Sequence, residues 1–178
     1  YMHGIPGKLL LFLGAEVAQW SEWNHEGTVE WPEYGNNRWG VGHCLADLNR
    51  VYRDEASMHV GDCTPDGFEW IDCSDADQSV IAFLRHGGPR PVLCVYNFTP
   101  VPRDGYELGV PVGGDWSELI TTAAEAYGGG GIGYLGRVTA LPRARHGHDQ
   151  VRSLRLPPLG AVFLAPKADP KDGPASPS

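Results

Sequence analysis

Apolar and polar residues follow one another in three different ways along this chain, and each pattern is typical of a different kind of structure. The run Lys8 to Leu13 is continuously apolar after its lysine, which predicts a parallel strand buried on both faces. From Asn37 to Met58, apolar residues recur at helical spacing, with Asn36 or Asn37 available as an N-cap. This segment is therefore predicted to form one amphipathic helix.

After Gly61 the pattern changes to short β-rich runs separated by Gly, Pro and Asp, which predicts an antiparallel sandwich. The boundary between the two parts falls near His59 to Asp66. The last residues, 166–178, are rich in Pro, Ser and charge and are predicted to be disordered. The predicted strands are Phe68–Asp72, Ser79–His86, Val92–Phe98, Tyr106–Val110, Trp116–Ile120, Val151–Leu156 and Ala161–Leu164.

The first strand and the helix that returns from it amount to half of a βαβ unit. Such a unit cannot bury its own faces, so the pattern indicates that upstream elements are missing. In α/β folds, ligands bind at the loops after the carboxyl ends of parallel strands. The stretch GAEVAQWSEWNHEG, Gly14 to Gly27, is therefore where a site is expected.

Composition narrows the class of protein and of partner. With 178 residues, of which 42% are hydrophobic and 20% charged, the chain resembles soluble globular proteins. No apolar run is long enough to span a bilayer, and no secretory signal is visible. The net charge of -8 argues against nucleic acid and anionic membranes as partners and favours a neutral ligand. Four scattered cysteines predict neither a zinc site nor a disulfide framework, but reduced and mostly buried thiols: Cys44, Cys63, Cys73 and Cys94.

The stretch after the first strand carries the most chemistry. Its carboxylates Glu16, Glu22 and Glu26 invite comparison with a glycosidase pair, but three acids in one loop are more often solvated. Glu16 and Gln19 directly follow the strand, and either a structural role at the mouth of a barrel or contact with a sugar fits them. Flat indole rings suit sugar stacking or packing, and for Trp31, next to Pro32, packing is favoured.

Other motifs carry little information. The glycine-rich stretch Gly128 to Gly136 satisfies G-x-G-x-x-G, but lacks the preceding strand, the following helix and the acid of a dinucleotide site, and is predicted to be a loop. His146, His148 and Asp149 have no third ligand nearby and are predicted to be surface residues. Asn97 matches a glycosylation sequon but is predicted to be a strand-end residue. The motifs in the sequence therefore do not predict a self-sufficient active site.

Several long segments, in this order, resemble bacterial glycogen branching enzymes. The likeness extends from Tyr1 to about Ala165, with mild departures at Val17 and at His3-Gly4-Ile5. The segments that carry it are PGKLLLFLGAEVAQWSEWNHEG, LADLNRVYRDE, FEWIDCSDADQSVIAFLR, VLCVYNFTPVPRDGYELGVP and LRLPPLGAVFL.

The resemblance implies a fold made of the last strand–helix unit of a (β/α)8 TIM barrel followed by an all-β antiparallel sandwich. It assigns residues 1–60 to the end of the catalytic barrel, 61–165 to the C-terminal sandwich and 166–178 to a tail. The catalytic acids of these enzymes lie on earlier barrel strands, so the resemblance implies no catalytic residue and no metal ligand here. The positions it assigns to substrate binding are Glu16, Gln19, Trp23 and Asn24.

The implied activity is that of a cytoplasmic 1,4-α-glucan branching enzyme without a metal or organic cofactor. Such an enzyme cleaves an α-1,4 bond and transfers the segment to a C6 hydroxyl, and this chain alone is expected to be inactive. Its expected partners are an α-glucan and the missing barrel. Two alternatives stay open, namely a non-catalytic glucan-binding sandwich with aromatic residues such as Trp70 or Trp116 on an exposed face, and another amylase-superfamily enzyme, a trehalohydrolase or maltosyltransferase.

Overall fold

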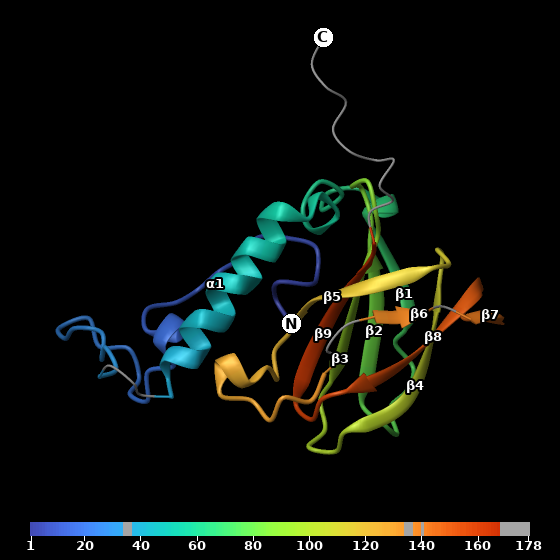
Figure 1. The fold of residues 1–178 in the computed structure, drawn as a ribbon. Coiled ribbons are helices and arrows are strands. Elements are labelled where there is room, and N and C mark those ends of the chain that lie inside the picture. Colours follow the sequence, from blue (N-terminus) through green and yellow to red (C-terminus); the bar gives the residue numbers. More distant parts are fainter. Residues whose placement is uncertain (34–36, 134–136, 140, 168–178) are drawn as a thin grey trace, which may run out of the picture.

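Three layers make up the protein. A computed structural model describes residues 1–33, 37–133, 137–139 and 141–167. A helix covers one face of a six-stranded sheet, and a three-stranded sheet covers the other (Figure 1). In chain order the elements are η1 Ala15–Val17, α1 Trp39–Asp54, η2 Ala56–Met58, η3 Pro65–Gly67, β1 Phe68–Asp72, β2 Val80–Arg85, β3 Val92–Asn97, β4 Arg103–Val110, β5 Asp115–Thr121, η4 Glu125–Tyr127, β6 Arg137–Thr139, β7 Leu141–Arg145, β8 His148–Leu156 and β9 Gly160–Pro166.

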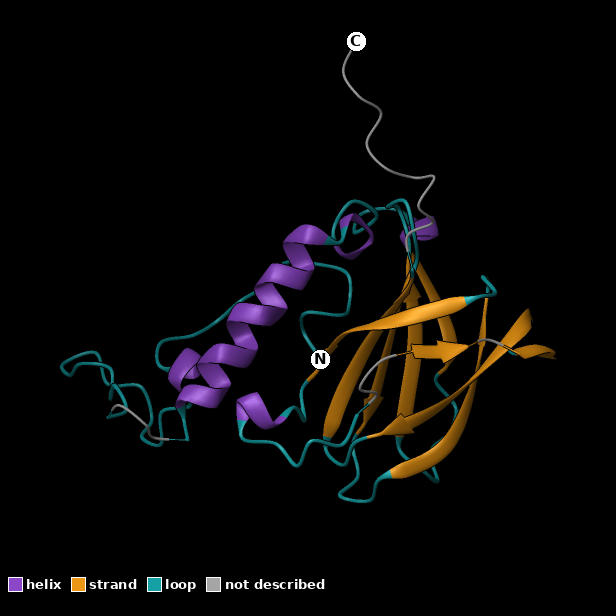
Figure 2. Ribbon diagram, in the orientation of Figure 1, coloured by secondary structure: helices purple, strands orange, loops and turns teal. Residues whose placement is uncertain are grey.

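The two sheets confirm the predicted antiparallel sandwich (Figure 2). The larger has the order β1-β2-β3-β9-β5-β6 and the smaller the order β4-β8-β7, and the strand pairs are antiparallel. All seven strands predicted for the sandwich are present, β1 with the predicted ends and the others with ends shifted by a few residues, while β6 and β7 were not predicted. The side chains of β7 are all exposed, so its sequence LPRAR lacks the alternation that marks a half-buried strand.

The larger sheet has an apolar core on each face. Alternate residues of its central strands, such as Leu84 and Val95, pack against the smaller sheet. The intervening residues, such as Phe83 and Cys94, pack against Val51 of α1 and the turn that follows it. A sheet covered on both faces explains why β3 reads as a continuous apolar run.

The segment Lys8 to Leu13 differs from its prediction. It forms no strand, and Leu10 is 75% exposed and Phe12 58% exposed. A strand needs a neighbour to receive its backbone hydrogen bonds, and the larger sheet ends at β1 and β6 elsewhere in the molecule. The apolar run therefore lies against solvent in this structure.

The predicted helix is confirmed over most of its length. It runs over Trp39–Asp54 and gives way to a short 3-10 turn, Ala56–Met58, so both ends fall inside the predicted range. Its N-cap is Arg38 rather than an asparagine, and the carbonyl of Asn37 accepts from the N–H of Gly40 at 3.0 Å. None of the helices in the described ranges is long and apolar enough to cross a membrane.

A buried arginine joins the N-terminal segment to the sandwich. Arg85 of β2 is fully buried, donates to the carbonyl of Gly4 at 2.7 Å and forms an ion pair with Asp62. Asp62 also accepts from the hydroxyl of Tyr52 on α1 at 3.3 Å. One charged cluster therefore connects β2, the helix and the first residues of the chain.

Three smaller predictions have mixed outcomes. The cysteines are free, but only Cys94 is fully buried, while Cys63 and Cys73 are exposed because they lie in loops. Asn97 is the last residue of β3 as predicted, and its buried amide donates to two backbone carbonyls. The tail from residue 168 and part of the glycine-rich stretch lie outside the described residues.

The two histidines were wrongly assigned to the surface. The turn between β7 and β8 folds against β1, so His146 lies 3.9 Å from Asp72 and His148 lies 2.9 Å from Glu69. Their side chains are only 21% and 14% exposed. Burial, with the nearby charge of Arg145, holds the pKa of His146 below its usual value.

Candidate functional site

The candidate site is built from residues 14–30, which we call the lip. It begins with η1, where the N–H of Gln19 and that of Val17 both donate to the carbonyl of Gly14, at 3.0 and 3.2 Å. Gly14 has φ 85°, and a side chain there would meet that of Gln19 at 2.7 Å, so only glycine fits this position without strain. Ala18 also lies in the left-handed region, with φ 49° and ψ 50°. The chain thereby turns sharply just before Gln19.

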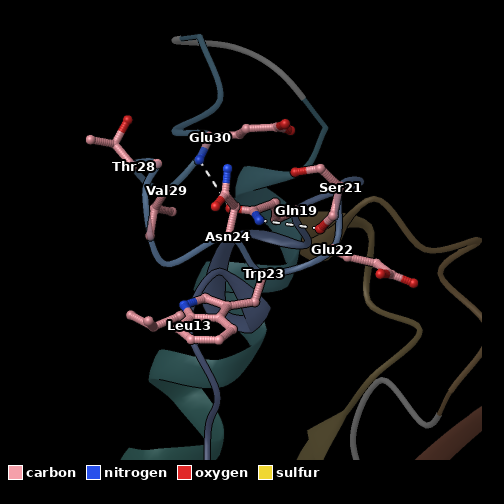
Figure 3. Close-up of a pocket in the computed structure, with 10 residues that line it drawn as sticks. Leu13, Gln19, Ser21, Glu22, Trp23, Asn24, Thr28, Val29 and Glu30 are labelled. Carbon is pink, nitrogen blue, oxygen red and sulfur yellow. Dashed lines mark hydrogen bonds between the residues drawn. The ribbon is translucent and has the colours of Figure 1, made fainter.

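An open cavity of about 450 Å³ lies within the lip (Figure 3). Its walls combine an indole ring and two aliphatic side chains with amide, hydroxyl and carboxylate groups. The lining residues are Leu13, Gln19, Ser21, Glu22, Trp23, Asn24, Gly27, Thr28, Val29 and Glu30. An apolar wall with a few polar groups is typical of sites for small, largely neutral ligands.

Three of the four predicted site residues meet in this cavity. Gln19, Trp23 and Asn24 line it, whereas Glu16 lies in η1 and is not part of the lining. The Gln19 amide is held at both ends, because its Oε1 accepts from the N–H of Glu30 at 3.0 Å and its Nε2 donates to the carbonyl of Ser21 at 3.2 Å. The cavity wall at Gln19 is therefore fixed by backbone contacts.

The tryptophans of this region are exposed to different degrees. Trp23 packs edge-on against Phe12, with ring centroids 5.6 Å apart, and remains half exposed. Trp20 is 87% exposed, and Trp31 is 64% exposed. The packing role predicted for Trp31 is wrong in this structure, because Pro32 next to it is buried instead.

Arg38 is a residue of this region that the sequence did not reveal. Its Nε donates to the carbonyls of Val17 and Ala18, both at 3.0 Å, and its Nη2 donates to the carbonyl of Glu30 at 2.9 Å. A single arginine before a helix has no sequence signature for such contacts. Only the folded chain places these carbonyls beside it.

The chemistry available at the cavity favours binding. Glu22 and Glu26 are exposed, which agrees with solvated carboxylates rather than a buried catalytic pair. Among the residues that the structure describes, no group of three or more His, Cys, Asp or Glu is placed to hold a metal ion. An indole face with amide and carboxylate groups nearby can stack on a sugar ring and hydrogen-bond its hydroxyls.

Known proteins place the sandwich in a family. The profile described as "Alpha amylase, C-terminal all-beta domain" matches residues 70–167. The crystal structure of an alpha-amylase from H. orenii superposes with a TM-score of 0.53 at 15% identity, covering 92% of this chain and 33% of that one. This second likeness shows the fold alone.

Curated relatives extend the likeness over the lip and helix. A 1,4-alpha-glucan branching enzyme of Pseudomonas putida is 46% identical over 93% of this chain and 23% of its own length. The branching enzyme of Aquifex aeolicus is 46% identical over 92% of this chain and 26% of its own length. The chain thus spans about a quarter of these relatives. They confirm the resemblance seen in the sequence, and the chain belongs to the family of alpha-amylase C-terminal all-beta domains.

Proposed function

We propose that this chain is the C-terminal part of a 1,4-α-glucan branching enzyme. The observation that carries the proposal is the 46% identity to such an enzyme over 93% of the chain, which includes the lip as well as the sandwich. In the whole protein, an α-1,4 bond between C1 and O4 is cleaved with retention through a covalent glucosyl-enzyme intermediate. O4 leaves with a proton in this first step. The oxygen of a C6 hydroxyl then attacks C1 as the bond from C1 to the enzyme breaks, and the hydroxyl loses its proton as the α-1,6 bond forms.

The lip is proposed to hold the glucan and to limit the access of water. Trp23 offers a half-exposed indole face, and Gln19 and Asn24 offer amide groups on the same cavity. Glu16, outside the lining, is proposed to contact glucan only beyond this cavity, toward the missing barrel. The catalytic acids are proposed to lie in the part of the enzyme that this chain does not include.

The domain organisation is proposed on the same basis. Residues 1–60 form the last strand and helix of a (β/α)8 barrel, residues 61–165 the C-terminal sandwich, and residues 166–178 a tail. Exposed leucines at positions 10, 11 and 13 support this, since a barrel strand is apolar on both faces and needs neighbours to cover it. A cytoplasmic location is proposed, as for an enzyme of glycogen synthesis.

The first prediction tests the lip. In the full-length gene product acting on linear α-1,4 glucan, Trp23→Ala is expected to lower the rate of α-1,6 bond formation about tenfold, because a sugar–indole stacking contact of roughly 1–1.5 kcal/mol is lost. The measurement is the number of α-1,6 linkages after enzymatic debranching.

The matched control is Trp20→Ala. Trp20 is 87% exposed and does not line the cavity, so its replacement should leave branching within about twofold of wild type. Equal rates for wild type and Trp23→Ala would exclude the lip as a glucan contact. A wild-type protein that forms no α-1,6 linkages would contradict the branching activity itself.

A second candidate function, glucan binding by the sandwich, has one observation in its favour. Trp70 of β1 is 47% exposed and packs beside Phe68 and Phe83 on the helix-covered face of the larger sheet. Trp116, the other candidate, is fully buried between the sheets and counts against it. If the sandwich binds glucan, Trp70→Ala should weaken retention of this chain on immobilised glycogen about tenfold, whereas Trp23→Ala should not. Equal retention of wild type and Trp70→Ala would exclude this surface.

A further inference from the structure

Arg38 connects the beginning of the lip to its end. The carbonyls of Val17 and Ala18 come just before Gln19, and the carbonyl of Glu30 is at the last residue of the lip. A guanidinium is rigid and planar, so one side chain that binds all three carbonyls fixes their relative positions. Gln19 adds a second link between the same two ends through the N–H of Glu30.

The lip has a strained turn at the point that Arg38 holds. Ala18 has φ 49° and ψ 50°, a left-handed conformation that is strained for an L residue with a side chain. Arg38 binds the carbonyl of this residue and that of the preceding one. The turn at Ala18 sets the direction of the chain between η1 and Gln19. The guanidinium therefore stabilises the orientation of the cavity wall at Gln19.

The N-terminus of α1, which carries Arg38, is tightly packed. Arg38 is the N-cap of α1, and a side chain at Gly40 would meet the carbonyl of Tyr127 at 2.2 Å. At Gly42 a side chain would meet the carbonyl of Glu16 at 3.1 Å. The first turn of the helix is therefore enclosed between η4 and η1, and Arg38 extends from a fixed support.

We propose that Arg38 is a positioning residue for the transfer reaction, an inference that rests on the proposed function. Once the α-1,4 bond is cleaved, O4 has taken a proton and C1 is bonded to the enzyme nucleophile. That bond then breaks as C1 forms a bond either to O6 of an acceptor or to the oxygen of water, each of which loses a proton. The first outcome makes a branch, and the second makes a new reducing end. By holding the turn before Gln19 and the end of the lip at Glu30 in place, Arg38 favours the ordered acceptor over water.

The test replaces Arg38 in the full-length enzyme and measures the ratio of new α-1,6 linkages to new reducing ends on linear α-1,4 glucan. Arg38→Met should lower this ratio about tenfold, since small misplacements of binding groups have effects of about this size or larger. Arg38→Lys keeps the charge but lacks the planar fork that binds all three carbonyls. Its ratio should therefore fall between that of the wild type and that of Arg38→Met. Adding Ala18→Gly to Arg38→Met should restore part of the ratio, because glycine adopts the left-handed turn without strain.

The control is Arg50→Met on the same helix, where Arg50 is 60% exposed and pairs with Asp47. It should keep the wild-type ratio. A merely structural role for Arg38 would lower total turnover and leave the ratio unchanged, and that result overturns the inference, as does a wild-type ratio in a folded Arg38→Met. If Arg38→Met does not fold, the ratio of Arg38→Lys decides in the same way. Absence of branching by the wild type would instead contradict the proposed function.

Discussion

Asp62→Ala is expected to destabilise this chain by about 3–5 kcal/mol, the usual effect of removing one partner from a buried ion pair. Arg85 has no exposed surface and would keep its charge without a counter-ion. The hydroxyl of Tyr52 would lose its acceptor as well. The measurement is the free energy of unfolding of the 178-residue chain in urea, compared with that of the wild type.

Two further variants separate the charge effect from a general loss of packing. Asp62→Ala combined with Arg85→Met should be less destabilised than Asp62→Ala alone, because the unpaired buried charge is gone. Asp54→Ala removes the carboxylate of an exposed pair with Arg53, and should cost less than about 0.5 kcal/mol. If the double variant is no more stable than Asp62→Ala, the buried charge is not the cause.

Leu10→Lys is expected to change the free energy of unfolding very little in this chain and to lower it strongly in the full-length enzyme. In the chain, Leu10 is 75% exposed, so the free energy of unfolding should change by less than about 0.5 kcal/mol and self-association should decrease. In the full-length enzyme, the proposed barrel buries this position, and an unpaired lysine there should cost about 3 kcal/mol or more. The measurements are urea unfolding of both proteins and sedimentation of the chain.

Leu141→Lys is the control for this comparison. Leu141 is 58% exposed on β7, in the smaller sheet, and should tolerate lysine in both proteins. If Leu10→Lys lowers the free energy of unfolding of the full-length enzyme no more than Leu141→Lys does, that result would falsify the assignment of residues 8–13 to a buried barrel strand.

The location of the candidate site could be predicted from the sequence because its parts are neighbours in the chain. Gln19, Trp23 and Asn24 all fall within a few residues of one another, and the same local turn brings them to one cavity. Glu16 is equally close in sequence, but the 3-10 turn directs it away from the lining. Arg38 could not be predicted, because its contacts with Val17, Ala18 and Glu30 depend on how the helix packs against the lip.

Local sequence pattern was enough to predict seven of the nine strands in the described ranges and α1, and the sequence also showed which family they resemble. Apolar periodicity and turn residues act over short distances, so seven strands and α1 follow from local pattern alone. Tertiary structure decided which apolar runs are buried. VLCVY in β3 is covered by two other layers, whereas the equally apolar run before Gly14 lies against solvent. Burial depends on neighbours distant in sequence, and for that run the described chain supplies no neighbouring strand.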